Sequence, residues 1–78
     1  MTRIPRISGN VMIKYLIKQN FTIATRKGSH VTLRRDYLSV TIPARNSRLK
    51  IGLLLGVLNK ADINKEKFMD DWNHGIVK

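Results

Sequence analysis

One histidine lies among basic and hydroxyl residues in a pattern that suits proton transfer beside a phosphate group. His30 directly follows the segment Lys27-Gly28-Ser29, and Thr32 and Arg34 follow it at alternate positions. In a strand, such alternate side chains share one face. An imidazole can accept a proton from a hydroxyl or protonate a leaving oxygen, and nearby cations can hold a phosphate and stabilise its transition state. His30 is therefore the candidate catalytic residue.

The chemistry that fits this group is metal-free cleavage of RNA, in which the 2′-hydroxyl loses a proton and the leaving oxygen gains one. The candidate RNA-binding residues are basic or belong to the expected turn: Arg26, Lys27, Gly28, Ser29, Arg34 and Arg45. We expect Arg26 to point to the side of His30 if the turn is short. The pattern leaves open whether His30 is the base or the acid. The alternative is an exposed histidine with no special task.

The distribution of charge also favours a polyanionic partner. The 78-residue chain has a formal net charge of +10. Residues 1–61 contain 12 Lys and Arg but one acidic residue, Asp36, whereas residues 62–78 contain four acidic and three basic residues. A membrane-surface helix would gather its cations on one amphipathic segment. Here they are spread over several segments, which favours nucleic acid.

Length and composition limit the other possibilities. We expect a single domain over residues 1–78, with a core over about 4–72 and a tail over 73–78. The longest apolar stretch, 51–58, is much shorter than the about 20 residues of a membrane span. The chain starts with no apolar signal core, so we expect a cytoplasmic protein. With no cysteine and dispersed acidic residues, we expect neither a metal site nor a cofactor.

The periodicity of apolar residues predicts an α-β-β-β-α order. A helix with Ser8 as N-cap ends near Asn20, and three short alternating strands follow up to Pro43. A second helix begins near Lys50. Its Gly52 and Gly56 are expected to allow close packing against another surface. The predicted fold is an α+β, two-layer sandwich with helices on one face of a three-stranded antiparallel sheet. The other sheet face, rich in Thr, Ser and Arg, stays open.

A short third helix is expected after Asn64, its predicted N-cap. Ile63 and Phe68 have the spacing of a hydrophobic staple. Trp72, four residues after Phe68, is predicted to lie in the core. Tyr37, in the expected second turn, has two interpretations: packing at the edge of the turn, or stacking on a nucleobase.

The motifs follow one another in the order seen in a known family. Segment 5–9 (Pro-Arg-Ile-Ser-Gly) opens the first helix, Gly28-Ser29-His30 follows the first strand, and Thr41-Ile42-Pro43 ends the third strand. Segment 49–52 (Leu-Lys-Ile-Gly) then leads into the Leu-rich helix. In this the chain resembles the HicA family of toxins from toxin–antitoxin systems, over about residues 4–72. Gly28-Ser29-His30 is the most specific part of the resemblance.

The resemblance implies a fold like the double-stranded-RNA-binding domain and a ribonuclease that cleaves messenger RNA. It implies that His30 is the catalytic residue and that a HicB-like antitoxin covers the active surface. Two segments depart from the family pattern. Segment 44–47 lacks the second histidine of many relatives, which makes Arg45 a candidate replacement for phosphate contact, and Gly52-Leu53-Leu54 replaces Gly-Thr-Leu.

Two other functions remain compatible with the sequence alone. One is an RNA- or DNA-binding module on the same fold that does not cleave. The other is a protein whose main surface binds another protein.

Overall fold

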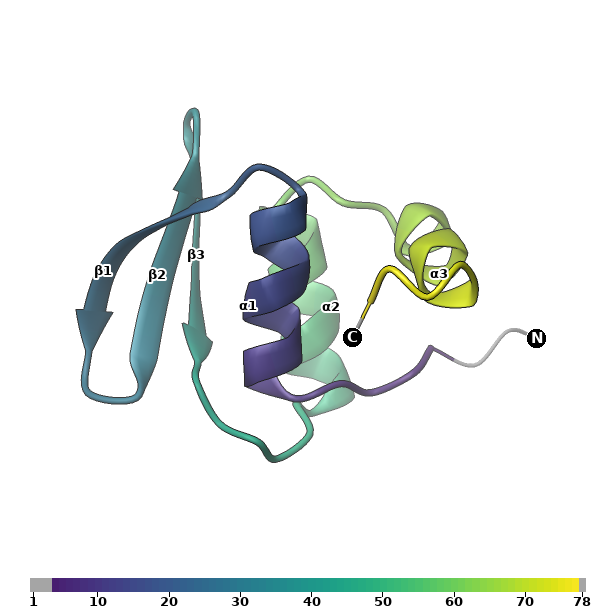
Figure 1. The fold of residues 1–78 in the computed structure, drawn as a ribbon, viewed down its shortest axis with the longest axis horizontal. Helices are drawn as coiled ribbons and strands as arrows, with labels where there is room; N and C mark the ends of the chain where they lie inside the picture. The colour runs from purple at the N-terminus through teal and green to yellow at the C-terminus, as the bar shows by residue number, and fades with distance from the viewer. Residues whose placement is uncertain (1–3, 78) are drawn as a thin grey trace.

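The computed structural model describes residues 4–77, and its elements follow the predicted order. They are α1 (Gly9–Lys18), β1 (Thr22–Lys27), β2 (His30–Arg35), β3 (Leu38–Pro43), α2 (Ile51–Lys60) and α3 (Lys65–Asn73). The strands form one antiparallel sheet in the order β1-β2-β3. Helices α1 and α2 lie side by side along one face of the sheet, and α3 lies beyond them, away from the strands (Figure 1). The predicted α+β fold with one open sheet face is confirmed.

The start of α1 is fixed by its cap and by a close contact with the sheet. Ser8 is the N-cap, and its hydroxyl accepts a hydrogen bond of 3.1 Å from the Val11 N–H. A Cβ atom on Gly9 would overlap the carbonyl oxygen of Pro43. Glycine at this position therefore lets the first turn of α1 lie directly against the end of β3, where the candidate site begins.

Two tight turns connect the strands. Gly28 and Ser29 join β1 to β2, and Gly28 has a φ of 57°, in the left-handed region that glycine adopts most readily. Asp36 and Tyr37 join β2 to β3, with a φ of 54° at Asp36. Asp is one of the residues that tolerates this region. Each two-residue turn fixes which residues pair across the antiparallel strands that it connects.

The core is formed by the inner sides of β2 and β3 and by the helices. Val31, Leu33, Val40 and Ile42 are buried beneath α1 and α2. The sequence predicts helices on one face of the three-stranded sheet, but they do not cover β1, in which every residue is exposed, including Ile23 at 46%. In Figure 1, β1 is the strand farthest from the two helices, so they do not cover it.

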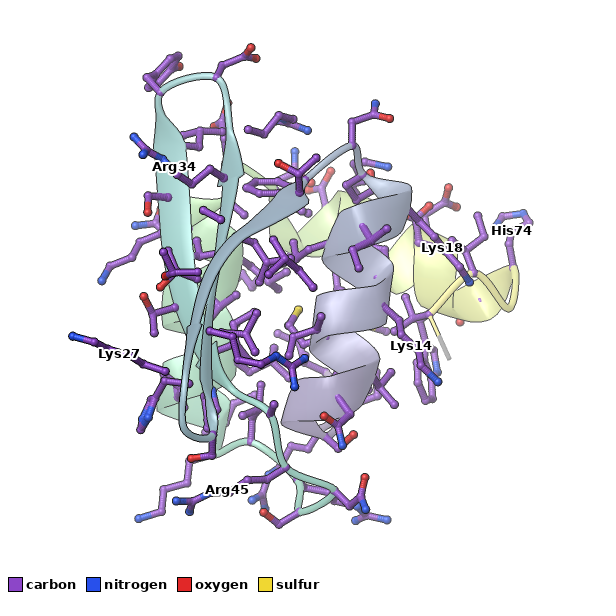
Figure 2. All side chains as sticks on the ribbon, turned by 60° about the vertical axis from the view of Figure 1, so that its left-hand side comes forward. Lys14, Lys18, Lys27, Arg34, Arg45 and His74 are labelled. Atoms are coloured by element: carbon purple, nitrogen blue, oxygen red, sulfur yellow. The ribbon has the colours of Figure 1, made fainter. Side chains whose placement is uncertain are left out.

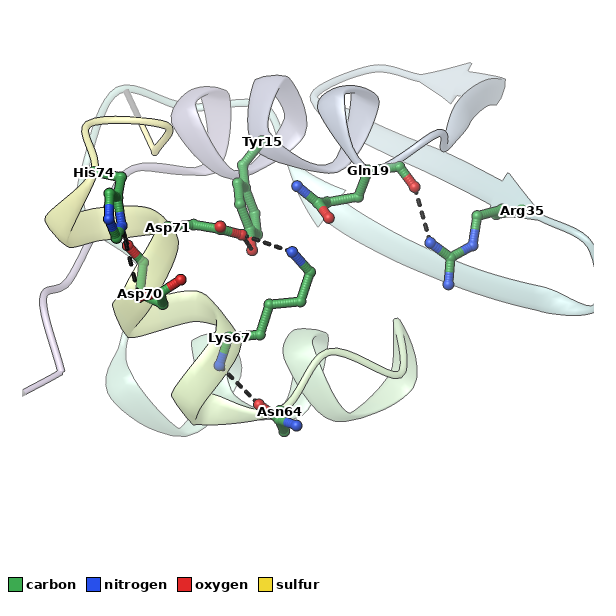
Figure 3. Close-up of polar contacts among 8 residues, drawn as sticks. All are labelled: Tyr15, Gln19, Arg35, Asn64, Lys67, Asp70, Asp71 and His74. Atoms are coloured by element: carbon green, nitrogen blue, oxygen red, sulfur yellow. Dashed lines mark hydrogen bonds and ion pairs between the residues drawn. The ribbon is translucent and has the colours of Figure 1, made fainter.

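Helix α3 begins as predicted but packs through a different residue. The side chain of Asn64 accepts a hydrogen bond of 2.7 Å from the Lys67 N–H, and Phe68 is buried against Tyr15 in an edge-to-face contact. The prediction of a core Trp72 is wrong, because Trp72 is 40% exposed. The neighbouring Asp71 is the residue that faces α1, and its carboxylate accepts a 2.6 Å hydrogen bond from the Tyr15 hydroxyl (Figure 3).

Two further expectations are corrected by the packing. Gly52 and Gly56 lie on the exposed side of α2, and a Cβ atom at either would have no neighbour within 4 Å among residues 4–77. Neither glycine therefore serves close packing against the described part of the chain. Val77 is buried, which extends the core beyond the expected limit of residue 72. None of the helices within residues 4–77 is long and apolar enough to cross a membrane.

Candidate nucleic-acid interface

The open face of the sheet is defined by its register. Cross-strand partners point to the same side, so three rows of side chains lie on the face opposite the helices: Lys27, His30 and Pro43; Thr25, Thr32 and Thr41; Thr22, Arg34 and Ser39. We call these nine residues the open face. None of them is acidic, and basic and hydroxyl side chains predominate. The arrangement confirms that His30, Thr32 and Arg34 share one face.

His30 lies at the end of the open face nearest the first turn. It is exposed and is the direct cross-strand partner of Lys27, with only Gly28 and Ser29 between them. The carbonyl of Ser29 accepts a hydrogen bond from the N–H of Ala44, which ties this turn to the segment after β3. The backbone around His30 is therefore held on both sides, while the imidazole is accessible to a ligand.

Arg26 does not point toward His30, contrary to the prediction. Its partner is Val31, which is buried on the helix side of the sheet. The prediction assumed a turn that begins at Lys27, whereas the turn consists of two residues and pairs Lys27 with His30. A shift of one residue moves a strand side chain to the opposite face. Lys27 therefore has the position expected for Arg26.

Arg45 is near the His30 end of the sheet. Its carbonyl accepts a 3.1 Å hydrogen bond from the N–H of Asn10, and its own N–H donates to the Pro43 carbonyl at 2.9 Å. The side chain of Asn10 also donates to the side chain of Asn46 at 2.6 Å. These bonds fix the loop against α1. Figure 2 shows Arg45 at the end of the molecule where the β1–β2 turn lies, with its side chain exposed.

Arg34 occupies the other end of the same face. It lies four positions after His30 along β2, a distance of about 13 Å at about 3.3 Å per residue. Between them, the hydroxyls of Thr32 and Thr41 lie 3.0 Å apart and form a hydrogen bond. The two ends of the open face are thus separate cationic positions linked by hydroxyl groups (Figure 2).

The positive charge of this surface is not neutralised within the described chain. The ion pairs among residues 4–77, Lys67 with Asp71 and His74 with Asp70, both lie in or next to α3. Figure 2 shows His74 on the far side of the helices from Lys27 and Arg34. The second histidine is therefore remote from the open face. Residues 4–77 also contain no group of three or more His, Asp or Glu side chains arranged to hold a metal ion.

Two hydroxyl residues of the open face, Thr22 and Thr25, are absent from the predicted site. The register shifts between Ile23 and Thr25, so that Ala24 is an extra residue in β1. Such a bulge places residues three apart on one face. Simple alternation puts Thr22 and Thr25 on opposite faces, and the sequence contains no clear signal for the bulge.

The comparisons with known proteins bear on this site directly. The family described as HicA toxin of bacterial toxin-antitoxin matches residues 9–63. The matched segment runs from the first residue of α1 to just beyond α2 and includes the whole open face. No curated protein and no solved structure gave a significant match. Because the family matches more than half of the 78 residues, this chain belongs to the HicA toxin family and is a toxin of a toxin–antitoxin system.

Proposed function

We propose that the chain is a metal-independent endoribonuclease that cleaves messenger RNA in the cytoplasm and is neutralised by a HicB-like antitoxin. The observation that supports this most strongly is the pairing of His30 with Lys27 across a two-residue turn, on a face without acidic side chains. An accessible proton-transfer group is thus next to a cation that can bind the scissile phosphate.

The reaction breaks one bond and forms another at phosphorus. The 2′-oxygen of RNA loses its proton and attacks the adjacent phosphorus, the bond to the 5′-oxygen breaks, and that oxygen gains a proton. His30 carries out one of these two proton transfers. Lys27 and Arg45 stabilise the charge on the non-bridging oxygens, and Arg34 binds a more distant phosphate. The small residues Gly28 and Ser29 allow the RNA to approach the backbone of the turn closely.

A specific observation also favours the second candidate, a binding module that does not cleave. The open face holds one imidazole, and His74 is on the opposite side of the molecule. A single general acid–base group has no obvious partner for the second proton transfer. The binding module would bind RNA through the same positive charges as the ribonuclease, but it would release no cleaved RNA.

Expression in cells separates the two candidates. We expect wild-type protein to arrest growth and to fragment messenger RNA, and the His30→Ala variant to do neither while accumulating to the same level. His74→Ala is the matched control, because it removes an exposed imidazole remote from the face. Equal toxicity of wild type and His30→Ala would contradict the catalytic assignment. Co-expression of the antitoxin should restore growth of cells that make the wild-type protein.

A further inference from the structure

Tyr37 is exposed to an unusual degree at the tip of the β2–β3 turn. Its exposed fraction is 85%, whereas the other exposed large hydrophobic residues among those described range from 37% to 47%. The interpretation that Tyr37 packs at the edge of the turn is therefore wrong. Burying an aromatic ring is favourable, so a ring left in water at a fixed position is available to a ligand.

The fold gives no reason for an aromatic residue at this position. Within residues 4–77, Tyr37 makes no side-chain hydrogen bond and no aromatic contact. The unusual backbone conformation of the turn belongs to Asp36, with its φ of 54°. Any small polar residue at position 37 would serve the turn equally well.

The tip adjoins the end of the open face that is distant from His30. Arg35 and Leu38 are the partners that flank the turn, and Arg34 and Ser39 form the next pair, on the open face. Arg35 is engaged elsewhere, because its guanidinium donates to the Gln19 carbonyl at 2.8 Å (Figure 3). The same guanidinium also lies over the ring of Phe21. Arg34 is exposed and makes no side-chain hydrogen bond or ion pair to any described residue. Among the cations of the open face, it is therefore the one nearest to the Tyr37 turn in the strand register.

The chemistry of the tip favours a base rather than a phosphate. The carboxylate of Asp36 repels phosphate, whereas the face of an aromatic ring stacks on any base without regard to charge. Arg34, in the second residue pair below the turn, is placed to hold the phosphate that precedes or follows that base. We propose that Tyr37 and Arg34 form a second RNA subsite, in which Tyr37 stacks on an unpaired base and Arg34 binds the neighbouring phosphate. The subsite rests on the proposed ribonuclease function and adds a position outside its catalytic end.

The subsite makes cleavage depend on the length of the RNA. A dinucleotide at His30 cannot also reach a position more than about 13 Å away along the strand. A longer single strand can occupy both ends of the open face, and only an unpaired base is free to stack. Tyr37 should therefore contribute to kcat/KM for long single-stranded RNA and leave dinucleotide cleavage unchanged.

The test compares Tyr37→Ala, Tyr37→Trp and the control Ile51→Ala, which removes a half-exposed side chain on α2. We expect Tyr37→Ala to lower kcat/KM on long single-stranded RNA about tenfold or more, with no change on a dinucleotide. Tyr37→Trp and Ile51→Ala should retain wild-type values on both substrates. No loss on long RNA, or an equal loss on both substrates, would overturn the proposal.

A binding measurement separates failure of the subsite from failure of the catalytic proposal. Fluorescence anisotropy with a labelled long single-stranded RNA reports Kd for the Tyr37 variants without any need for cleavage. If no protein cleaves RNA but Tyr37→Ala still raises Kd about tenfold and Tyr37→Trp does not, the subsite stands and the enzyme assignment fails. If Tyr37→Ala changes neither Kd nor cleavage while His30→Ala abolishes cleavage, the subsite is refuted and the enzyme assignment stands.

Discussion

Lys27 and His30 face each other as cross-strand partners, separated by the two residues of the β1–β2 turn. This relationship brings a cation beside the candidate proton-transfer group, and the hydrogen bond from the Ala44 N–H to the Ser29 carbonyl ties the turn to the segment after β3. It depends on the turn, since a turn longer by one residue would pair His30 with a different residue. The geometry of Gly28 is therefore part of the site.

Replacement of Gly28 should destabilise the hairpin through its backbone alone. Its φ of 57° disfavours alanine, although a Cβ atom there would meet no neighbour within 4 Å among the described residues. We expect Gly28→Ala to lower the free energy of unfolding by about 1–2 kcal/mol, measured by urea denaturation. Gly56→Ala is the matched control. Gly56 has equally open surroundings but lies inside α2, where alanine should stabilise by up to about 1 kcal/mol. Equal effects of the two substitutions would contradict this account.

The two basic residues before the turn should differ in their contribution to RNA binding. Lys27 lies on the open face and Arg26 on the opposite side. We expect Lys27→Ala to weaken the binding of single-stranded RNA and to reduce the slope of log K against log salt concentration by about 0.7, the loss of one phosphate contact. Arg26→Ala should leave the slope unchanged. A larger change for Arg26→Ala than for Lys27→Ala would show that RNA does not bind across the open face.

The contact between Tyr15 and Asp71 should make the stability depend on pH at both extremes. Burial disfavours the charged carboxylate of Asp71, but hydrogen bonds from Tyr15 and Lys67 and the positive charge of Lys67, with that of His74, outweigh it and hold the pKa of Asp71 below its usual range. Burial, together with the hydrogen bond and charge of Asp71, raises the pKa of the Tyr15 hydroxyl above its usual range.

The sign of each effect follows from which state holds the proton more tightly. As pH is lowered below about 4, the usual range of an aspartic acid, the unfolded chain takes up a proton at Asp71 before the folded chain does. The free energy of unfolding therefore falls as pH is lowered. Above about pH 10, the usual range of tyrosine, the unfolded chain loses the Tyr15 proton first, so stability falls as pH rises.

Tyr15→Phe tests this contact. It should lower the free energy of unfolding at neutral pH by about 1–3 kcal/mol, because it leaves the buried carboxylate short of a donor. It should also flatten the fall in stability above about pH 10. Urea denaturation across the pH range gives both results. If Tyr15→Phe loses stability above about pH 10 as steeply as the wild type, a group other than Tyr15 causes that loss.

The elements and their order are predictable from the sequence because local signals specify them. Ser8 and Asn64 are caps that accept a backbone N–H, and the alternation in β2 and β3 separates a buried from an open side. These signals need only neighbours in the chain. They also predict that His30 and Arg34 share a face, since both belong to one strand.

The features that could not be predicted depend on one-residue differences or on packing between elements. The side on which Arg26 lies is decided by the length of the turn, and the face of Thr22 by the extra residue at Ala24. In α3, Trp72 and Asp71 are adjacent, and the approach of α1 with Tyr15 decides that the acid is buried. The exposure of β1 follows from where the helices cross the sheet, which the pattern of β1 itself does not contain.

The central claim is that His30 performs proton transfer in RNA cleavage. The most direct test measures how fast the purified protein cleaves a purified messenger RNA in the presence of a chelator. We predict that the wild-type protein cleaves under these conditions and that His30→Ala is slower by about 10²- to 10⁴-fold, with unchanged RNA affinity within about threefold. Equal rates for the two proteins, or complete loss of wild-type cleavage in the chelator, would contradict the account.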